Sequence, residues 1–149
     1  MKKMIFTLAL GLLTAIGANA QAEHVQNTKG DWYLGTGNLA DVAWTDWSVS
    51  PTIGYGVTDD VMVGFNLSQA NSEADILVDL HARYFLDVKG QSLFIYTSME
   101  DVINFNTDHL NVGVGKLFTL HKCVYVDPKI VFNVGETTTN LQLGFGLRF

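Results

Sequence analysis

The last ten residues, Asn140-Leu-Gln-Leu-Gly-Phe-Gly-Leu-Arg-Phe149, alternate between apolar and polar or small side chains. The apolar set is Leu141, Leu143, Phe145, Leu147 and Phe149. Successive side chains of a β-strand point to opposite faces, so a period of two indicates a strand rather than a helix. This stretch therefore predicts a strand with one apolar and one polar face that continues to the last residue.

The same alternation occurs in seven segments upstream. The predicted strands are residues 31–38, 47–57, 61–68, 76–86, 92–99, 110–115, 124–133 and 140–149. The first and the fifth are weaker, and in the fifth Phe94, Ile95 and Tyr96 interrupt the pattern. Short turns at 58–60, 87–91 and 120–122 alternate with longer connections at 39–46, 69–73, 100–107 and 134–139. An even number of antiparallel strands places the first beside the last, so the pattern predicts a closed, eight-stranded up-and-down barrel over residues 30–149.

The N-terminus has the features of an export signal. Lys2 and Lys3 precede an apolar run over residues 4–16, and Ala18-Asn19-Ala20 forms a cleavage site before Gln21. The run is short for a membrane anchor and no stop-transfer charges follow it. We therefore expect residues 1–20 to be a cleaved signal peptide and 21–29 a short N-terminal segment. Cys123 is the single cysteine, which leaves no internal disulfide, and we expect it to be a buried thiol on the inward face.

The composition of the chain argues against some classes of function. The 149 residues include 9 Lys+Arg and 15 Asp+Glu, a net charge of -6, which argues against nucleic-acid binding through phosphates. Hydrophobic residues make up 48% of the chain, yet no apolar run after Gln21 is long enough for a transmembrane helix. The hydrophobicity is instead distributed over one face of each strand.

Three features predict that the apolar face points outward to lipid. The strands have about the 9–11 residues that a tilted membrane strand needs. The polar faces are rich in Gly, Ser, Thr and Asn, which suits a narrow lumen better than a water-facing surface. Aromatic residues at the ends of the apolar face resemble interfacial girdles; they are Trp32, Tyr55, Tyr84, Phe118 and Phe149 at the turn end and Trp44 and Trp47 at the loop end.

The leader, the eight alternating strands and the terminal strand together resemble a small Gram-negative outer-membrane β-barrel of the OmpX and OmpA-barrel class. The resemblance covers residues 30–149. It implies a monomer in the outer membrane, in contact with its lipid and lipopolysaccharide. It also implies that the barrel-assembly machinery recognises the terminal strand through Leu143, Phe145, Leu147 and Phe149.

The polar faces predict a lumen filled by an ionic network rather than a channel. Its candidates are Asp79, His81, Arg83, Tyr125, Asp127, Lys129 and Arg148. This set contains two carboxylates, three fixed cations and a histidine, whose charges can nearly neutralise one another. Such pairing is needed because an unpaired charge is costly to remove from water. A proton or ion path through His81 is the alternative.

The four longer connections and their flanks carry acidic residues and neither Lys nor Arg. The acidic set is Asp41, Asp46, Glu73, Asp75, Glu100, Asp101, Asp108 and Glu136. Binding of lipopolysaccharide phosphates by this rim would require bridging divalent cations, for which carboxylates are suitable ligands. A solvated acidic surface is the alternative, because no connection has the spacing of a calcium loop. We predict no cofactor and no dedicated metal site.

The sequence favours a structural or surface-interaction protein without catalysis. Two alternatives come from other classes. One is an exported, soluble, lipocalin-like barrel that binds an apolar ligand inside. The other is a lipid A-modifying enzyme, for which Ser98, Asp108 and His109 are candidates. Adjacent strand residues point to opposite faces, so Asp108 is poorly placed to orient His109.

Overall fold

The computed structural model describes residues 27–39, 51–68, 76–88, 91–104, 107–121 and 123–149. These contain nine strands in one antiparallel sheet: β1 (Trp32–Thr36), β2 (Pro51–Gly56), β3 (Val61–Ser68), β4 (Leu77–Val88), β5 (Gln91–Met99), β6 (Leu110–Lys116), β7 (Phe118–His121), β8 (Val124–Asn133) and β9 (Thr138–Arg148). Two short 3-10 helices, η2 (Val102–Asn104) and η3 (Thr107–His109), lie between β5 and β6.

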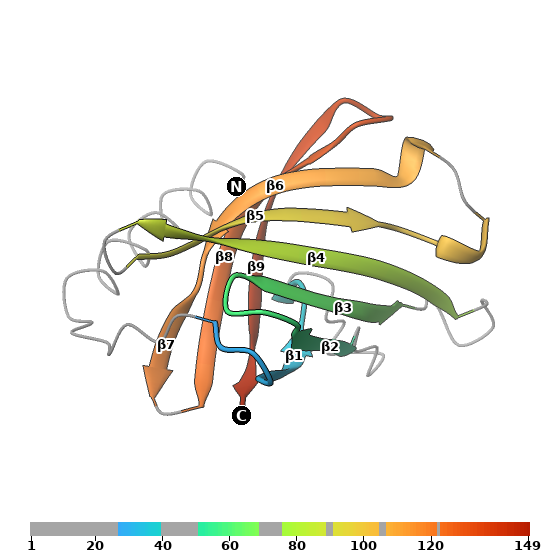
Figure 1. Ribbon diagram of the computed structural model, residues 1–149. Coiled ribbons are helices and arrows are strands. Elements are labelled where there is room, and N and C mark those ends of the chain that lie inside the picture. The colour runs from blue at the N-terminus through green and yellow to red at the C-terminus, as the bar shows by residue number, and fades with distance from the viewer. Residues whose placement is uncertain (1–26, 40–50, 69–75, 89–90, 105–106, 122) are drawn as a thin grey trace.

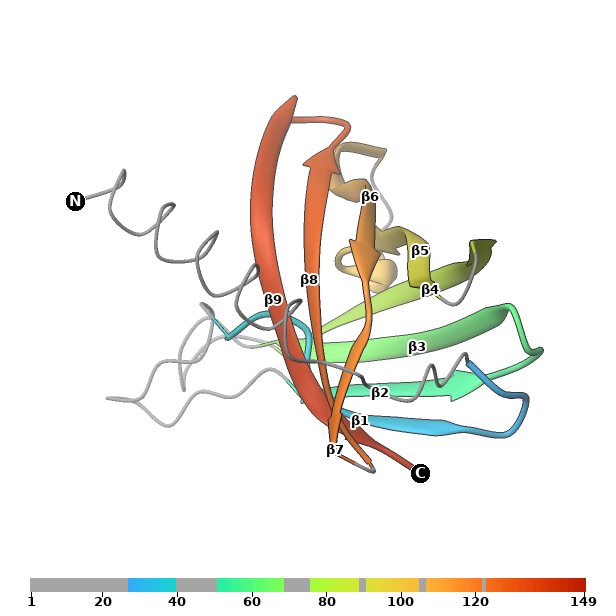
Figure 2. The ribbon, with the colours of Figure 1, turned by 90° about the vertical axis from the view of Figure 1, so that its left-hand side faces the viewer.

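The sheet closes on itself as an eight-stranded barrel, as predicted. β1 pairs with β2 on one side and with β9 on the other, and β6 pairs with β8 (Figures 1 and 2). β6 and β7 are two pieces of one wall strand, since both pair with β8 and Leu117 alone separates them. Closure leaves the barrel without a free first or last strand.

Several strand boundaries differ from the prediction. β4 extends to Val88 and β5 begins at Gln91, so the predicted turn at 87–91 is mostly strand. The reason is that the cross-strand ladder continues through the Asp87–Ser92 and Val88–Gln91 pairs. β7 includes residues 120 and 121, which were predicted to belong to the turn at 120–122. β9 begins at Thr138, two residues before the predicted start of the last strand at residue 140. Residues 47–50 of the predicted second strand lie outside the described residues.

The two faces of the wall differ sharply in chemistry. The inward face holds the buried core of Tyr33, Met62, Phe85, Phe94, Tyr96, Leu117, Tyr125 and Val131, together with buried polar and charged side chains. The outward face carries large apolar side chains that are exposed: Trp32, Leu34, Tyr55, Val63, Leu80, Tyr84, Val88, Ile95, Val112, Val114, Ile130, Phe132, Leu141, Leu143, Phe145 and Leu147. The weak alternation in β5 is explained by Phe94 and Tyr96, which are aromatic but point inward.

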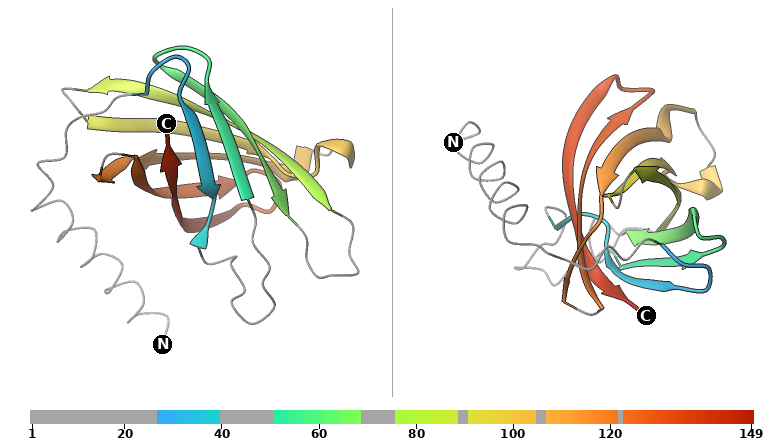
Figure 3. Two further views of the ribbon diagram at one scale, coloured as in Figure 1. Left: turned by 90° about the horizontal axis from the view of Figure 1, so that it is seen from below. Right: turned by 60° about the vertical axis from the view of Figure 1, so that its left-hand side comes forward.

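The start of β1 and the C-terminal residue meet at the turn end of the barrel. Trp32 and Phe149 exchange backbone hydrogen bonds of 3.1 and 3.0 Å, and the C-terminus lies beside β1 (Figure 3). Residues 27–29, which precede β1, pack against the barrel. The Asn27 side chain is 2% exposed and donates to the carbonyl oxygens of Thr58 and Asp59. Within the described residues, no helix is long and apolar enough to cross a membrane.

Candidate functional site

An ion pair crosses the centre of the lumen. Arg83 on β4 lies against Asp127 on β8, and both side chains are almost completely buried. The Arg83 guanidinium also lies over the Phe94 ring, 4.9 Å from its centroid. Gly144 on β9 is the register partner of Asp127, and a side chain there would overlap the carboxylate. The glycine therefore provides the space in which Asp127 reaches Arg83.

Lys129 and His81 lie against the same aromatic ring. The Lys129 Nζ atom donates to the carbonyl oxygen of Gly37 at 2.5 Å and is 5.3 Å from the centroid of Tyr96. The His81 ring stacks on Tyr96 with centroids 6.1 Å apart and an interplanar angle of 28°. Both side chains are buried, so the lumen at this level is filled by protein atoms.

A second ion pair fills the turn end of the lumen. Arg148 donates from Nε to Asp31 Oδ2 at 2.9 Å, and its Nη2 lies 2.6 Å from the same oxygen. Tyr33 donates its hydroxyl to Asn27 Oδ1 at 2.8 Å and packs edge-on against Tyr125, with centroids 5.6 Å apart. Hydrogen bonds and ring contacts thus continue the filled interior down to the N-terminal segment.

The seven residues of the predicted ionic network all lie on inward positions of β4, β8 and β9. The predicted network did not include Asp31, which comes directly before β1. It is two residues from the inward Tyr33, so the period of two could have indicated that Asp31 also points inward. The interior then holds three carboxylates, since Asp31 joins Asp79 and Asp127. This number equals that of the fixed cations, which are Arg83, Lys129 and Arg148. Asp79 lies nearest the loops, where its Oδ1 accepts from the backbone N–H of Asp101 at 3.0 Å.

The described part of the acidic rim is held by local hydrogen bonds. Glu100 accepts from Asn111 Nδ2 at 2.8 Å, and Asp101 accepts from Asn104 Nδ2 at 2.8 Å. The backbone N–H of Glu136 donates to Asn133, and the Asp108 side chain is exposed. Among the described residues, no three His, Cys, Asp or Glu side chains gather as a metal site would require. The predicted rim residues Asp41, Asp46, Glu73 and Asp75 lie outside the described residues.

The residues weighed for catalysis are not gathered. Ser98 is buried on the inward face of β5, where its register partners are His81 on β4 and Asn111 on β6. Asp108 and His109 were predicted to lie at the start of the sixth strand. They lie instead in η3, at the loop end of the barrel. Cys123 is half-buried rather than buried, because it lies at the turn that precedes β8.

The predicted aromatic girdle falls on the outer wall where the structure describes it. Trp32 and Tyr55 are register partners with ring centroids 5.0 Å apart, and Tyr84 and Phe149 are exposed on the same face. Phe118 is half-buried beneath the Lys116 ammonium, 5.0 Å from its ring centroid. Trp44 and Trp47 lie outside the described residues.

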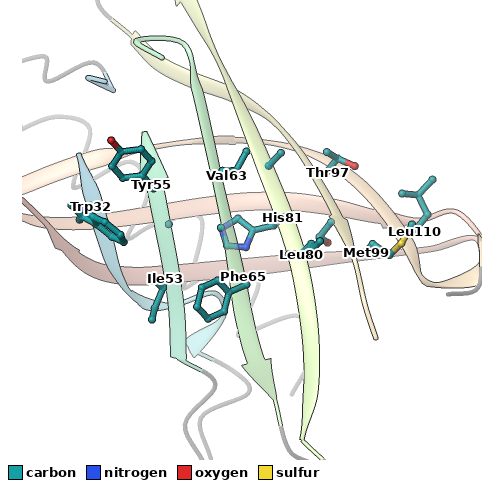
Figure 4. A pocket seen from close by; sticks show the side chains of 14 residues that line it. Trp32, Ile53, Tyr55, Val63, Phe65, Leu80, His81, Thr97, Met99 and Leu110 are labelled. Atoms are coloured by element: carbon teal, nitrogen blue, oxygen red, sulfur yellow. The ribbon is translucent and has the colours of Figure 1, made fainter. Parts of the chain in front are cut away.

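The outer wall also contains an apolar hollow of about 820 Å³ that crosses β1 to β6. Two cross-strand rows of outward side chains line it (Figure 4). One row runs through Trp32, Tyr55, Val63, Ala82 and Thr97, and the other through Ile53, Phe65, Leu80, Met99 and Leu110. The hollow therefore lies on the outer face and not in the lumen.

No known family, curated protein or solved structure matches the chain. The geometry of the barrel is therefore the basis for assigning a function. Its two distinctive properties are the charged side chains inside and the large apolar side chains outside.

Proposed function

We propose that this protein is an integral outer-membrane barrel with a side-chain-filled lumen and an acidic surface, and that its role is structural or in surface interaction, without catalysis. The observation that carries the proposal is the inversion of polarity across the wall. Arg83, Asp127 and Lys129 are buried inside, whereas the outward face of the same strands is apolar and exposed.

This distribution favours a lipid environment on energetic grounds. The exposed apolar side chains run along every strand of the wall and continue through the hollow of Figure 4. Monomeric proteins in water rarely expose apolar patches larger than a few hundred Å². A closed barrel satisfies its backbone hydrogen bonds internally, which is the condition for crossing a bilayer.

The terminal strand supports recognition by the barrel-assembly machinery. Leu143, Phe145, Leu147 and Phe149 are all exposed on the outward face of the last strand and its end. In this proposal the machinery reads that face, the folded barrel is a monomer, and outer-membrane lipid then covers it. Contact of the rim with lipopolysaccharide through divalent cations is a further part of the proposal.

The two alternatives have less support. A soluble lipocalin-like barrel needs an apolar interior cavity, whereas the described interior holds the buried Arg83–Asp127 pair and the partly buried Arg148–Asp31 pair, and the apolar hollow is outside. A lipid A-modifying enzyme needs its acid, base and nucleophile together at the rim. Ser98 is inside the lumen and Asp108 is exposed at the loop end.

Electrophoresis in SDS, with and without boiling, tests the proposal. The mature chain, beginning at Gln21, is first refolded into detergent micelles. A closed membrane barrel resists SDS until it is heated, so the boiled and unboiled samples should migrate differently. Identical migration, together with a soluble folded chain in the absence of detergent, would overturn the proposal.

A further inference from the structure

The apolar hollow on the outer wall is long and narrow. It crosses the six strands β1 to β6, so five spacings of about 4.8 Å between strands make it about 24 Å long. Its two rows of side chains are two residues apart along each strand, which separates them by about 6.6 Å. The inward residues between the rows form its floor; they are Gly54, Gly64, His81 and Ser98. The hollow is therefore a groove between two rows of side chains.

One of these rows contains a gap at Ala82. Its neighbours in the row are Val63 on β3 and Thr97 on β5, and Ala82 has the smallest side chain in either row. On its own strand, the flanking residues of the same face, Leu80 and Tyr84, are both large and exposed. The atoms around a gap lack contacts on one side, so an occupant that fits it gains dispersion contacts there.

The lining of the groove is mainly apolar, and its two ends differ. Among the described residues that line it there is no Asp, Glu, Lys or Arg. Trp32 and Tyr55 lie at one end, and Met99 and Leu110 lie at the other (Figure 4). Trp and Tyr rings in membrane proteins are enriched at the level of the lipid headgroups. The end formed by Trp32 and Tyr55 therefore suits the polar part of an amphipathic molecule, and the rest of the groove suits its apolar part.

The width of the groove selects among apolar occupants. An α-helix with its side chains is about 10–12 Å across, which is too wide to lie between rows about 6.6 Å apart. An added strand would need free backbone groups, whereas β2 to β5 are each paired on both sides. The wall of a second barrel would contact the two rows and leave the floor uncovered. An unbranched hydrocarbon chain can contact both rows and the floor.

We propose that this groove binds one acyl chain of a membrane phospholipid, with the headgroup beside Trp32 and Tyr55. The inference rests on the proposed outer-membrane function, because it assumes that lipid covers the outer wall, and it deepens that function by naming a site for one lipid. Elsewhere on the wall, lipid contacts side chains from one side only. In the groove, the chain is surrounded on three sides, so the barrel retains this lipid while the others exchange.

Native mass spectrometry of the wild-type barrel tests the site without a variant. The mature chain is refolded in detergent, mixed with a few equivalents of phosphatidylcholine and released from the micelle in the spectrometer. The expected species is a monomer that retains one phospholipid. A bare monomer, or a monomer with a statistical distribution of lipids, would overturn the proposal. A lipid-free dimer would also overturn it, because a second copy would then cover the wall.

Tryptophan fluorescence tests whether the lipid lies in the groove. In a Trp44→Phe, Trp47→Phe background, Trp32 is the remaining tryptophan, and phosphatidylcholine with brominated acyl chains quenches it on binding. Ala82→Phe fills the gap, whereas Val114→Phe adds bulk to the exposed outer wall outside the groove. Quenching should saturate in the parent and in Val114→Phe, and the apparent affinity should fall at least tenfold in Ala82→Phe. Equal affinity in all three proteins would overturn the site.

Electrophoresis of the same samples separates failure of the site from failure of the proposed function. A barrel that migrates differently before and after boiling, but shows no saturable lipid binding, overturns the lipid site alone. A chain that folds in water without detergent overturns the outer-membrane function and the lipid site together. Ala82→Leu, a smaller change, takes the place of Ala82→Phe if the latter does not refold.

Discussion

Arg83 on β4 and Asp127 on β8 form an ion pair across the lumen, with the two side chains only 2% and 1% exposed. The pair joins β4 and β8, which are not neighbours in the sheet, and Gly144 on β9 leaves space for it. The attraction between the two charges offsets the cost of removing both from water. The filled lumen therefore depends on the two residues being present together.

The first prediction concerns this pair. Asp127→Leu or Arg83→Met alone should lower the free energy of unfolding by about 3–5 kcal/mol, because each leaves a buried charge without its partner. The double variant should recover most of that loss, since it buries no unpaired charge. Urea unfolding of the refolded barrel measures all four proteins. Additive losses in the double variant would show that the two side chains do not interact.

A second prediction concerns the contact between Gly64 and His81. Gly64→Ala should destabilise the barrel by about 1–3 kcal/mol, because the added methyl group would overlap the Ile53 backbone carbonyl oxygen and meet the His81 ring at 2.6 Å. Gly37→Ala is the matched control, since its nearest neighbours are side-chain atoms at 3.2 Å or more. The same unfolding measurement compares the two variants. An equal cost at both positions would argue against the close packing of Ile53 and His81 around Gly64.

A third prediction concerns the N-terminal segment. Tyr33→Phe removes the hydroxyl that donates to buried Asn27 and should cost about 1–3 kcal/mol, because Asn27 Oδ1 loses its donor. Tyr55→Phe, on the exposed outer face, should change stability little. Hydrogen exchange at residues 27–31 should accelerate in Tyr33→Phe but not in Tyr55→Phe. Unchanged exchange in both variants would mean that this hydrogen bond does not hold the segment.

The fold was largely predictable because a barrel wall imposes a period of two on the sequence. The eight strands and the closed order follow from that period and from the lengths of the connections. Strand ends were less predictable, because pairing such as Val88 with Gln91 depends on the neighbouring strand rather than on local residue preference. The break at Leu117 and the short strand β7 have the same origin, since both are set by pairing with β8.

The interior was predictable in its residues but not in its pairings. Alternation places Arg83, Asp127 and Arg148 inward, but which groups meet across the lumen depends on the stagger of the strands. Asp31 was missed because β1 is short and its pattern weak, although Asp31 is the partner of Arg148. The inward aromatics Phe94 and Tyr96 break the polar pattern, because a filled lumen also buries apolar groups.

A fourth prediction follows from the filled lumen. The refolded barrel should form no large, stable channels in planar lipid bilayers, because the Arg83–Asp127 and Arg148–Asp31 pairs and the aromatic core occupy the interior. Single-channel recording of the mature chain measures this. Steady conductance steps at the size of an open eight-stranded lumen would contradict a side-chain plug and would favour the ion path through His81.

The most direct test of the central claim places a nitroxide on the outer wall. Leu80→Cys and Glu136→Cys are each made in a Cys123→Ser background, spin-labelled and refolded into lipid vesicles. The account predicts that the label at residue 80 collides with oxygen and is shielded from a water-soluble nickel chelate, whereas the label at residue 136, on the exposed β8–β9 turn, behaves in the opposite way. Equal access of the nickel chelate to both labels would contradict a lipid-facing wall.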